Sequence, residues 1–119
     1  HCWLLASPSV ADSERFRDLK QNLLEQNVTP HVVLLDDVLR ANQVYAKVRE
    51  AINQAVPVGD AWPLIADITG GNKVMTAGIL LACLDAGVPV QYWVAPRNDR
   101  GDPLRSAESC AMQVVVRTP

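Results

Sequence analysis

The stretch LIADITGGNKVMTAGILLACLDAGVPVQYWV, residues 64–94, decides the fold. Its first six residues, 64–69, form an apolar run typical of a buried strand, and the glycine pair at 70–71 turns the chain into a helix. Gly87 is placed to end that helix, and residues 90–94 form the next apolar strand. The pattern therefore predicts a strand–helix–strand unit. The residues expected on the buried face of its helix are Val74, Ala77, Leu81 and Leu84.

The N-terminal half shows the same alternation. Apolar runs at 2–7 and 31–35 predict strands, and the helical spacing of apolar residues over 12–27 predicts an amphipathic helix between them. We expect Ser9 or Asp12 to cap that helix. The residues expected to cap the following helix are Asp36 and Asp37, and those expected on its buried stripe are Val38, Ala41, Tyr45, Val48, Ile52 and Ala55.

The remaining segments complete the expected topology. Two prolines and a glycine predict a loop at 57–63, and residues 112–118 predict a last strand, which we expect to be antiparallel. Strands that are nearly continuous apolar runs, alternating with helices, favour a single α/β domain over residues 1–119, with a mostly parallel sheet covered on both faces in three layers. The loops after the strands, at 7–12, 36–38, 69–73 and 94–103, should then open onto one edge.

Composition restricts the function classes. A net charge of −2 gives no global attraction to duplex nucleic acid or to an anionic membrane, so an anion site must be local. Three cysteines without a C-x-x-C pair predict neither a disulfide framework nor a zinc site and favour a reduced, cytoplasmic compartment. No apolar run approaches the ~20 residues of a membrane span. Because the sequence starts without Met, we expect a domain excised from a longer effector protein, with a membrane anchor only if a missing part supplies one.

The glycine turn is the candidate binding site. Helix N-termini present unsatisfied amides and a positive partial charge, and the glycines at 70–71 let a ligand rest against the main chain. Lys73 adds positive charge, and the hydroxyls of Thr69 and Thr76 are candidate donors to phosphate oxygens. Neither a Walker A loop nor a G-x-G-x-x-G fingerprint is present. The alternative is a tight structural turn with a solvated lysine.

Other candidates are weaker. His1 and His31 lie thirty positions apart without the spacing of a metal site, and no G-x-S-x-G motif predicts a serine hydrolase. Trp62 and Trp93 are candidates to stack on a base, and Trp93 is preferred because the strand 90–94 ends beside it. Core or interface packing is the alternative for both. The polar loop 97–103 and its flank offer Arg97, Arg100 and Arg105 as groups that could meet phosphates, with Asp99 and Asp102 as their alternative partners.

The segment DITGGNKVM, residues 67–75, resembles the T-G-G-x-K-x-M signature of the CRISPR-associated Rossmann fold (CARF) domains. The surrounding order of strands and helices is similar to that family over most of the chain, which implies a Rossmann-like fold. The resemblance further implies a homodimeric sensor that binds a cyclic oligoadenylate, most readily cyclic tetra-adenylate, and switches an attached effector in type III CRISPR antiviral defence. No cofactor, metal or duplex nucleic acid is implied.

The resemblance also implies the ligand-contacting residues. The residues that match the signature are Thr69, Gly70, Gly71 and Lys73. Asn72 stands where family members often have Thr, and this departure removes one hydroxyl contact. Ser7 and Ser9 follow the first strand, and they correspond to ligand-contacting residues of the family by position alone. The alternative function is a ring nuclease that cleaves the ligand slowly by metal-independent 2′-OH attack, with Ser7, Ser9, Thr69 and Lys73 as candidates and no evident general base. A third possibility is a Rossmann-like interaction domain that binds a mononucleotide or nothing.

Overall fold

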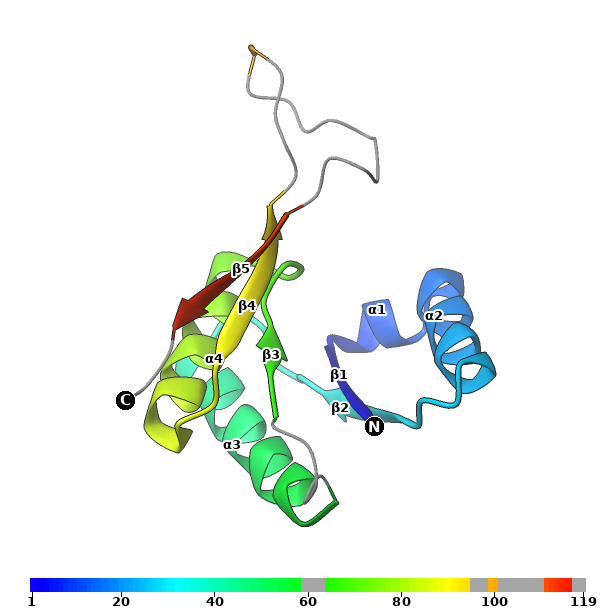
Figure 1. Cartoon of the computed structure of the whole chain (residues 1–119), viewed down its shortest axis with the longest axis horizontal. Helices are drawn as coiled ribbons and strands as arrows, with labels where there is room; N and C mark the ends of the chain where they lie inside the picture. Colours follow the sequence, from blue (N-terminus) through cyan, green and yellow to red (C-terminus); the bar gives the residue numbers. More distant parts are fainter. Residues whose placement is uncertain (59–63, 95–98, 101–110, 117–119) are drawn as a thin grey trace.

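The strands and helices alternate along the chain. The computed structural model describes residues 1–58, 64–94, 99–100 and 111–116, and for 56–58, 93–94 and 111–116 it describes the backbone alone. The elements are β1 (Cys2–Ala6), α1 (Pro8–Ala11), α2 (Glu14–Glu25), β2 (Pro30–Leu34), α3 (Ala41–Val58), β3 (Ala66–Asp67), α4 (Lys73–Ala86), β4 (Val90–Val94) and β5 (Ala111–Val116) (Figure 1). The predicted α/β class is confirmed. Of the helices in these ranges, none combines the length and apolar character that a membrane span requires.

The strands form two sheets, where the sequence predicted one. β1 and β2 are parallel, with Trp3 opposite His31. β3 is parallel to β4, and β4 is antiparallel to β5, which confirms the expected direction of the last strand. Along one edge, β1 and β3 are each without a strand neighbour among the described residues. The mostly parallel arrangement is therefore present in two pieces.

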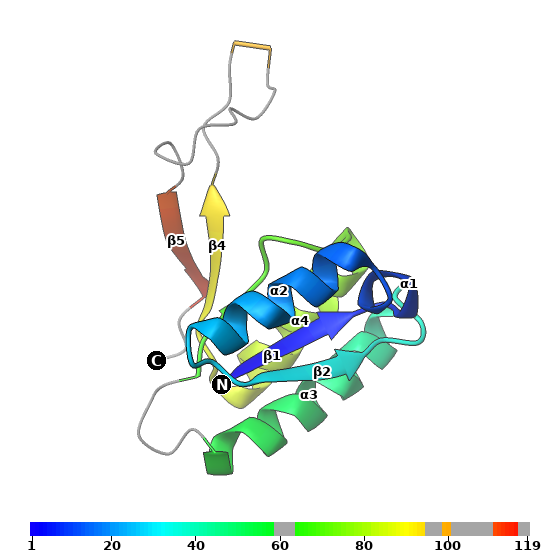
Figure 2. The same ribbon diagram turned by 90° about the vertical axis from the view of Figure 1, so that its right-hand side faces the viewer.

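Helices lie on both sides of the strands. In Figure 2, α2 lies on one side of the β1–β2 sheet and α3 lies on the other. α3 and α4 lie side by side along the sheet of β3, β4 and β5 (Figure 1). The main core forms where α3 and α4 meet the start of β4. Its buried residues are Leu35, Val44, Val48, Ile52, Ile79, Ala82, Cys83, Val88 and Val90.

The helix starts differ from the sequence expectation. The helix predicted over 12–27 is α2, which begins at Glu14 and is capped by Ser13 in place of Ser9 or Asp12. A short helix that was not predicted, α1, precedes it and is capped by Ser7. Asp37 does not cap α3 either, because its Oδ1 accepts a hydrogen bond from the amide of Leu39 at 3.0 Å, two residues before α3 begins. Aspartate side chains bond to backbone amides in turns as well as at helix starts, which is why Asp37 marks a turn here and not a cap.

The buried face of α4 is opposite to the predicted one. Gly78, Ile79, Ala82 and Cys83 are buried, whereas the predicted stripe of Val74, Ala77, Leu81 and Leu84 lies half-buried or exposed. The sequence was ambiguous here because α4 is apolar all round, so its periodicity does not single out one face. In α3 the predicted stripe is largely confirmed, with Val48, Ile52 and Ala55 buried, and Val44 added to it.

Gly78 sets the distance between α3 and α4. A Cβ built on Gly78 would lie 2.7 Å from the Cβ of Val44 and 2.9 Å from the carbonyl oxygen of Ala41. Real Cβ atoms essentially never approach so closely. Tyr45 Oη also donates a hydrogen bond of 2.5 Å to Asp85, farther along the same contact. The absence of a side chain at Gly78 therefore fixes how α4, and the turn before it, is held against α3.

Replacing Gly78 by alanine tests this contact. Gly78→Ala gains about 1 kcal/mol of helix propensity but overpacks the helix contact by about 3 kcal/mol, so we expect a net loss of roughly 2 kcal/mol in the free energy of unfolding. Urea denaturation measures it. Gly70→Ala is the control, because its Cβ would meet nothing within 4 Å, and its unfolding free energy should stay within about 0.5 kcal/mol of wild type. A Gly78→Ala protein as stable as wild type would contradict the close approach.

Candidate functional site

The glycine turn begins with an aspartate that fixes the backbone after β3. Asp67 Oδ1 accepts a hydrogen bond from the amide of Thr69 at 2.8 Å, and its Oδ2 accepts one from Gln91 Nε2 at 3.4 Å. Partial burial raises the pKa of Asp67, but the hydrogen bonds from the Thr69 side chain and amide and from Gln91 outweigh it and hold that pKa below its ordinary value. The carboxylate therefore shapes the turn as an ionised acceptor.

The two glycines of the turn differ in what they require. Gly71 has φ of +90°, a backbone conformation that side chains rarely adopt, so the turn itself demands glycine there. Gly70 has no positive φ, and a Cβ built on it would meet nothing within 4 Å among the described residues. The fold of the described chain therefore gives no reason for glycine at 70, where the backbone faces open space.

Asn72 closes the turn and starts α4. Its Oδ1 accepts a hydrogen bond from the amide of Met75 at 2.8 Å, and its backbone oxygen accepts one from the Thr76 hydroxyl at 3.1 Å. As the helix cap, Asn72 leaves the amides of the first helical positions, 73 and 74, without an acceptor inside the helix. Asn72 thus serves as a cap at the position where CARF domains often have Thr.

Lys73 is the exposed first residue of α4, at its positive end. It makes no ion pair with any residue in the described ranges. The hydroxyls that were expected as donors are already engaged, because Thr69 bonds to Asp67 and Thr76 bonds to Asn72. The free donors at this turn are therefore backbone amides and one ammonium group.

The turn after β2 touches the glycine turn. Asn72 Nδ2 donates a hydrogen bond to the backbone oxygen of Val38 at 3.4 Å. In that same turn Arg40 Nε lies 3.2 Å from Asp37 Oδ2, where the Arg40 side chain is largely exposed and the Asp37 side chain is partly covered. The loops at 36–38 and 69–73, which were expected to share an edge, therefore do so. The first of them carries the ion pair of Asp37 and Arg40, which has no net charge.

A cleft connects the glycine turn to β1. Its volume is about 580 Å³, and it runs between the edges of β1 and β3 that have no strand neighbour in the described part of the chain. Most of its lining is apolar, and the lining includes Trp3, Leu5, Phe16, Leu64, Met75, Ile79, Gly70 and Gly71. Gly70 and Gly71 therefore form part of the wall of an apolar cleft, in addition to the exposed turn.

The other predicted site residues lie apart from this cleft or outside the described side chains. Ser7 and Ser9 follow β1, where their hydroxyl oxygens lie 3.3 Å apart and Ser7 Oγ accepts a hydrogen bond from the amide of Val10 at 3.4 Å. Neither serine lines the cleft, although Val10 does. Trp93 belongs to β4, and its side chain lies outside the described part of the chain, as do Trp62 and the loop at 101–110.

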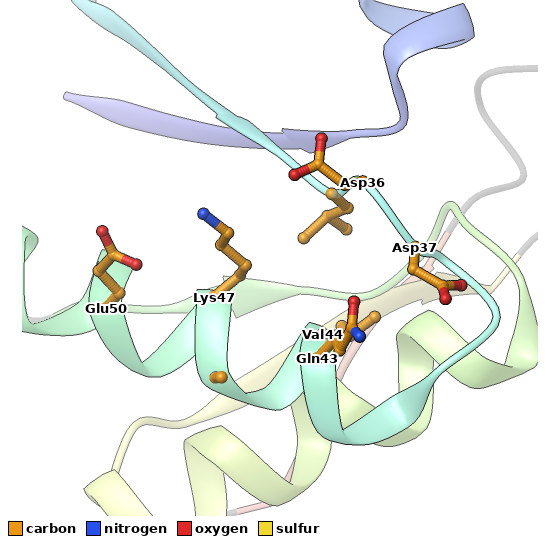
Figure 3. A pocket seen from close by; sticks show the side chains of 8 residues that line it. Asp36, Asp37, Gln43, Val44, Lys47 and Glu50 are labelled. Atoms are coloured by element: carbon orange, nitrogen blue, oxygen red, sulfur yellow. The ribbon is translucent and has the colours of Figure 1, made fainter.

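A second hollow lies where β2 ends against α3. Its volume is about 250 Å³, and in Figure 3 Lys47 extends from α3 toward the strands, with its ammonium group between Glu50 and Asp36. The charged residues that line it are Asp36, Asp37, Lys47 and Glu50. Because three carboxylates surround one ammonium group, this hollow does not suit an anion. The glycine turn is the better candidate for one.

The sequence interpretation missed an aromatic stack at the far end of β1. His1 and His31 share a hydrogen bond of 2.9 Å between Nδ1 and Nε2, and the Trp3 and His31 rings stack at 4.5 Å. The pairing of β1 with β2 brings them together across thirty positions. In the described ranges no group of three or more metal-ligating side chains gathers. No local sequence pattern indicated this stack, because it depends on the register of β1 and β2.

The lowered pKa of Asp67 predicts a pH-dependent effect of Asp67→Asn. A carboxylate whose folded pKa lies below its unfolded value adds stability that is fully present above the unfolded pKa and lost as pH falls through the folded one. We therefore expect Asp67→Asn to lower Tm at pH 7, with the difference shrinking as pH falls below about 4. Thermal melts of both proteins across pH measure this. Asp18→Asn, an exposed carboxylate on α2, is the control, and a pH-independent difference would contradict the assignment.

Comparison with known proteins adds no relative. No protein-family model matches the chain, and no curated protein matches it. The case for a function therefore rests on the geometry of the glycine turn and on the residues at 67–75 that resemble the CARF signature.

Proposed function

We propose that this chain is a sensor domain that binds a cyclic oligoadenylate, with cyclic tetra-adenylate as the first candidate, at the glycine turn. Two copies share one ring, and ligand binding switches an attached effector in type III CRISPR defence. Support comes from the CARF-like segment at 67–75, which lies between β3 and the N-terminus of α4. Helix N-termini of this kind stabilise phosphate groups through free amides and the helix dipole.

The observation that carries the proposal is the open space above Gly70. A glycine that has neither a positive φ nor a close neighbour in the described chain is unexplained by folding alone. A ligand that must approach the main chain supplies a reason, because a Cβ would stand between the backbone and a phosphate. Lys73, exposed at the next turn, places a positive charge beside that space.

Binding is proposed in preference to ring cleavage. In-line attack by a ribose 2′-OH requires groups that position the ribose and accept its proton. The hydroxyls of Thr69 and Thr76 are engaged with the protein, and Ser7 caps α1. These contacts favour a turn that holds phosphates over one that moves protons.

We propose in addition that β1 and β3 pair to give one sheet of a Rossmann-like three-layer sandwich. The amide of Cys2 bonds to Thr29, so by alternation the amides of Trp3 and Leu5 point to the opposite edge. On β3 the amides of Ala66 and Ile68 bond to the β4 side, which leaves Asp67 facing outward. Both outward edges border the same cleft. Pairing would satisfy their backbone groups and bury its apolar lining.

Such pairing would also explain the location of the ligand site. The strand order would become β2-β1-β3-β4-β5, with the chain moving from β1 to one side and from β3 to the other. Ligands in open α/β sheets bind at this point of reversal, beyond the carboxyl ends of the strands. Ser7 and Ser9 follow β1 and the glycine turn follows β3, so closure would bring the two groups of predicted site residues together.

Calorimetric titration tests ligand binding. We expect heat with cyclic tetra-adenylate or cyclic hexa-adenylate at one ring per two chains, and little with linear oligoadenylate. Lys73→Ala removes a charge that pairs with phosphate, and Gly70→Ala inserts a methyl group at the contact, so each should weaken binding at least about tenfold, or about 1.4 kcal/mol.

The control for these variants is stability. Gly70→Ala should lose binding while unfolding like wild type, which separates a blocked contact from a damaged fold. No heat with either ring would leave the turn as a structural feature. Equal binding by wild type and both variants would place the ligand elsewhere on the chain.

Hydrogen exchange tests the closure of the sheet. If β1 pairs with β3, the amides of Trp3 and Leu5 should exchange at least about 100-fold more slowly than in an unpaired edge strand, and ligand should slow them further. The amides of Leu4 and Ala6, which alternate toward β2, serve as internal controls. Rapid exchange at 3 and 5 beside slow exchange at 4 and 6 would contradict closure.

A further inference from the structure

The edge of β2 that faces away from β1 has no strand neighbour in the described part of the chain. On its other edge, the amide of Leu35 bonds to the carbonyl of Ala6 at 2.9 Å. By alternation, the backbone groups of Val33 face β1 as well, whereas those of Val32 and Leu34 face outward. β2 would stay at the end of the sheet if β1 paired with β3, so these outward amides and carbonyls would still be available to a further strand.

The side chains of β2 do little to prevent such pairing. Edge strands are commonly protected by charged side chains, by bulges or by proline. β2 contains no Asp, Glu, Lys or Arg, and its proline, Pro30, is its first residue. Val32 and Leu34 share one face of the strand, where their side chains are 42% and 45% exposed. An extended segment along this edge would therefore gain backbone hydrogen bonds and cover two apolar side chains.

An acidic hollow lies at the end of the same strand. It is the hollow between β2 and α3, lined by Asp36, Asp37, Glu50 and Lys47. Figure 3 shows the ammonium group of Lys47 between Glu50 and Asp36. Asp37 also pairs with Arg40. Three carboxylates thus face two positive groups, and this negative excess favours one further positive side chain.

We propose that the β2 edge binds an extended segment of another protein as an added strand, and that this segment carries two apolar residues at alternate positions and a lysine or arginine at odd spacing from them. The apolar side chains would lie beside Val32 and Leu34. The odd spacing follows because Leu35, which lines the hollow, points to the face opposite Leu34. The basic side chain would then reach the carboxylates of Asp36 and Glu50.

The charge of the hollow favours another protein over a second copy of this chain. If two copies paired through β2, each would present its own residues 28–39 to the other. That segment carries Asp36 and Asp37 and contains no lysine or arginine, so it does not supply the positive group. The surface is also separate from the proposed ligand site, since neither Val32 nor Leu34 lines the cleft beside the glycine turn.

Fluorescence anisotropy with a labelled peptide tests the edge. The probe has two valines that alternate with threonines and an arginine at the odd spacing, and it is made in both sequence orders. We expect one order to bind, and replacement of its arginine by glutamate should weaken binding at least about tenfold. N-methylation of the peptide amides that face β2 should have a similar effect, because it removes the hydrogen bonds of the added strand. No binding by either order at about 1 mM, or equal binding by the glutamate peptide, would overturn the inference.

Variants of the chain test the hollow. Glu50→Gln removes one of its carboxylates and should weaken binding of the arginine peptide at least about threefold, with little effect on the glutamate peptide. The matched control is Glu25→Gln, because Glu25 is an exposed glutamate at the end of α2, and this variant should bind like wild type. Equal binding of the arginine peptide by wild type and both variants would overturn the inference.

Hydrogen exchange tests the pairing and the identity of the occupant. Bound peptide should slow exchange of the amides of Val32 and Leu34 at least about tenfold. The amides of His31 and Val33 face β1 and serve as internal controls, which should change little. Unchanged exchange at 32 and 34 with the peptide bound would overturn the inference. Slow exchange at these positions in the free chain, lost on dilution, would also overturn it, because a second copy would then occupy the edge.

Discussion

The close approach of α3 and α4 is the contact on which the described structure depends. It requires the absence of a side chain at Gly78, where a Cβ would come within 2.7 Å of Val44. Around that point lie most of the buried apolar residues, and Tyr45 and Asp85 join the same two helices by a hydrogen bond. Because α4 is held there, the first residues of α4 and the glycine turn before them have a defined position. The packing of α4 in the core therefore sets the position of the candidate site.

Local signals predicted the elements well, because they act over a few residues. The glycine at 87 has φ of +71° and ends α4 as expected, and β4 has the predicted bounds, 90–94. The buried face of α4 was not predictable, since apolar residues lie on every side of it and only packing decides which side is covered. The stack of Trp3 on His31 likewise depends on strand register, which no local pattern sets.

The candidate site was predictable in part. The sequence indicated the glycines and Lys73, because a strand followed by small residues and a helix is a local pattern. It did not indicate that the hydroxyls of Thr69 and Thr76 would bond to Asp67 and Asn72. Nor did it indicate that Gly71 would have a positive φ and Gly70 would not. These properties depend on individual hydrogen bonds and dihedral angles. The groups that the turn offers to a ligand are therefore backbone amides and one ammonium group, and not hydroxyls.

The separation of β1 and β2 from the other strands has a consequence for folding cooperativity. Ala6 and Phe16 are buried, yet they lie outside the main core cluster. Leu5 packs against that cluster and Leu35, just after β2, belongs to it, so the segment from β1 to β2 is joined to the main core through these two leucines. Segments with few buried apolar contacts open at lower free energies than the core. While β1 and β3 are unpaired, the N-terminal strands should therefore open in a sub-global step before the rest unfolds, and pairing of β1 with β3 should couple the two steps.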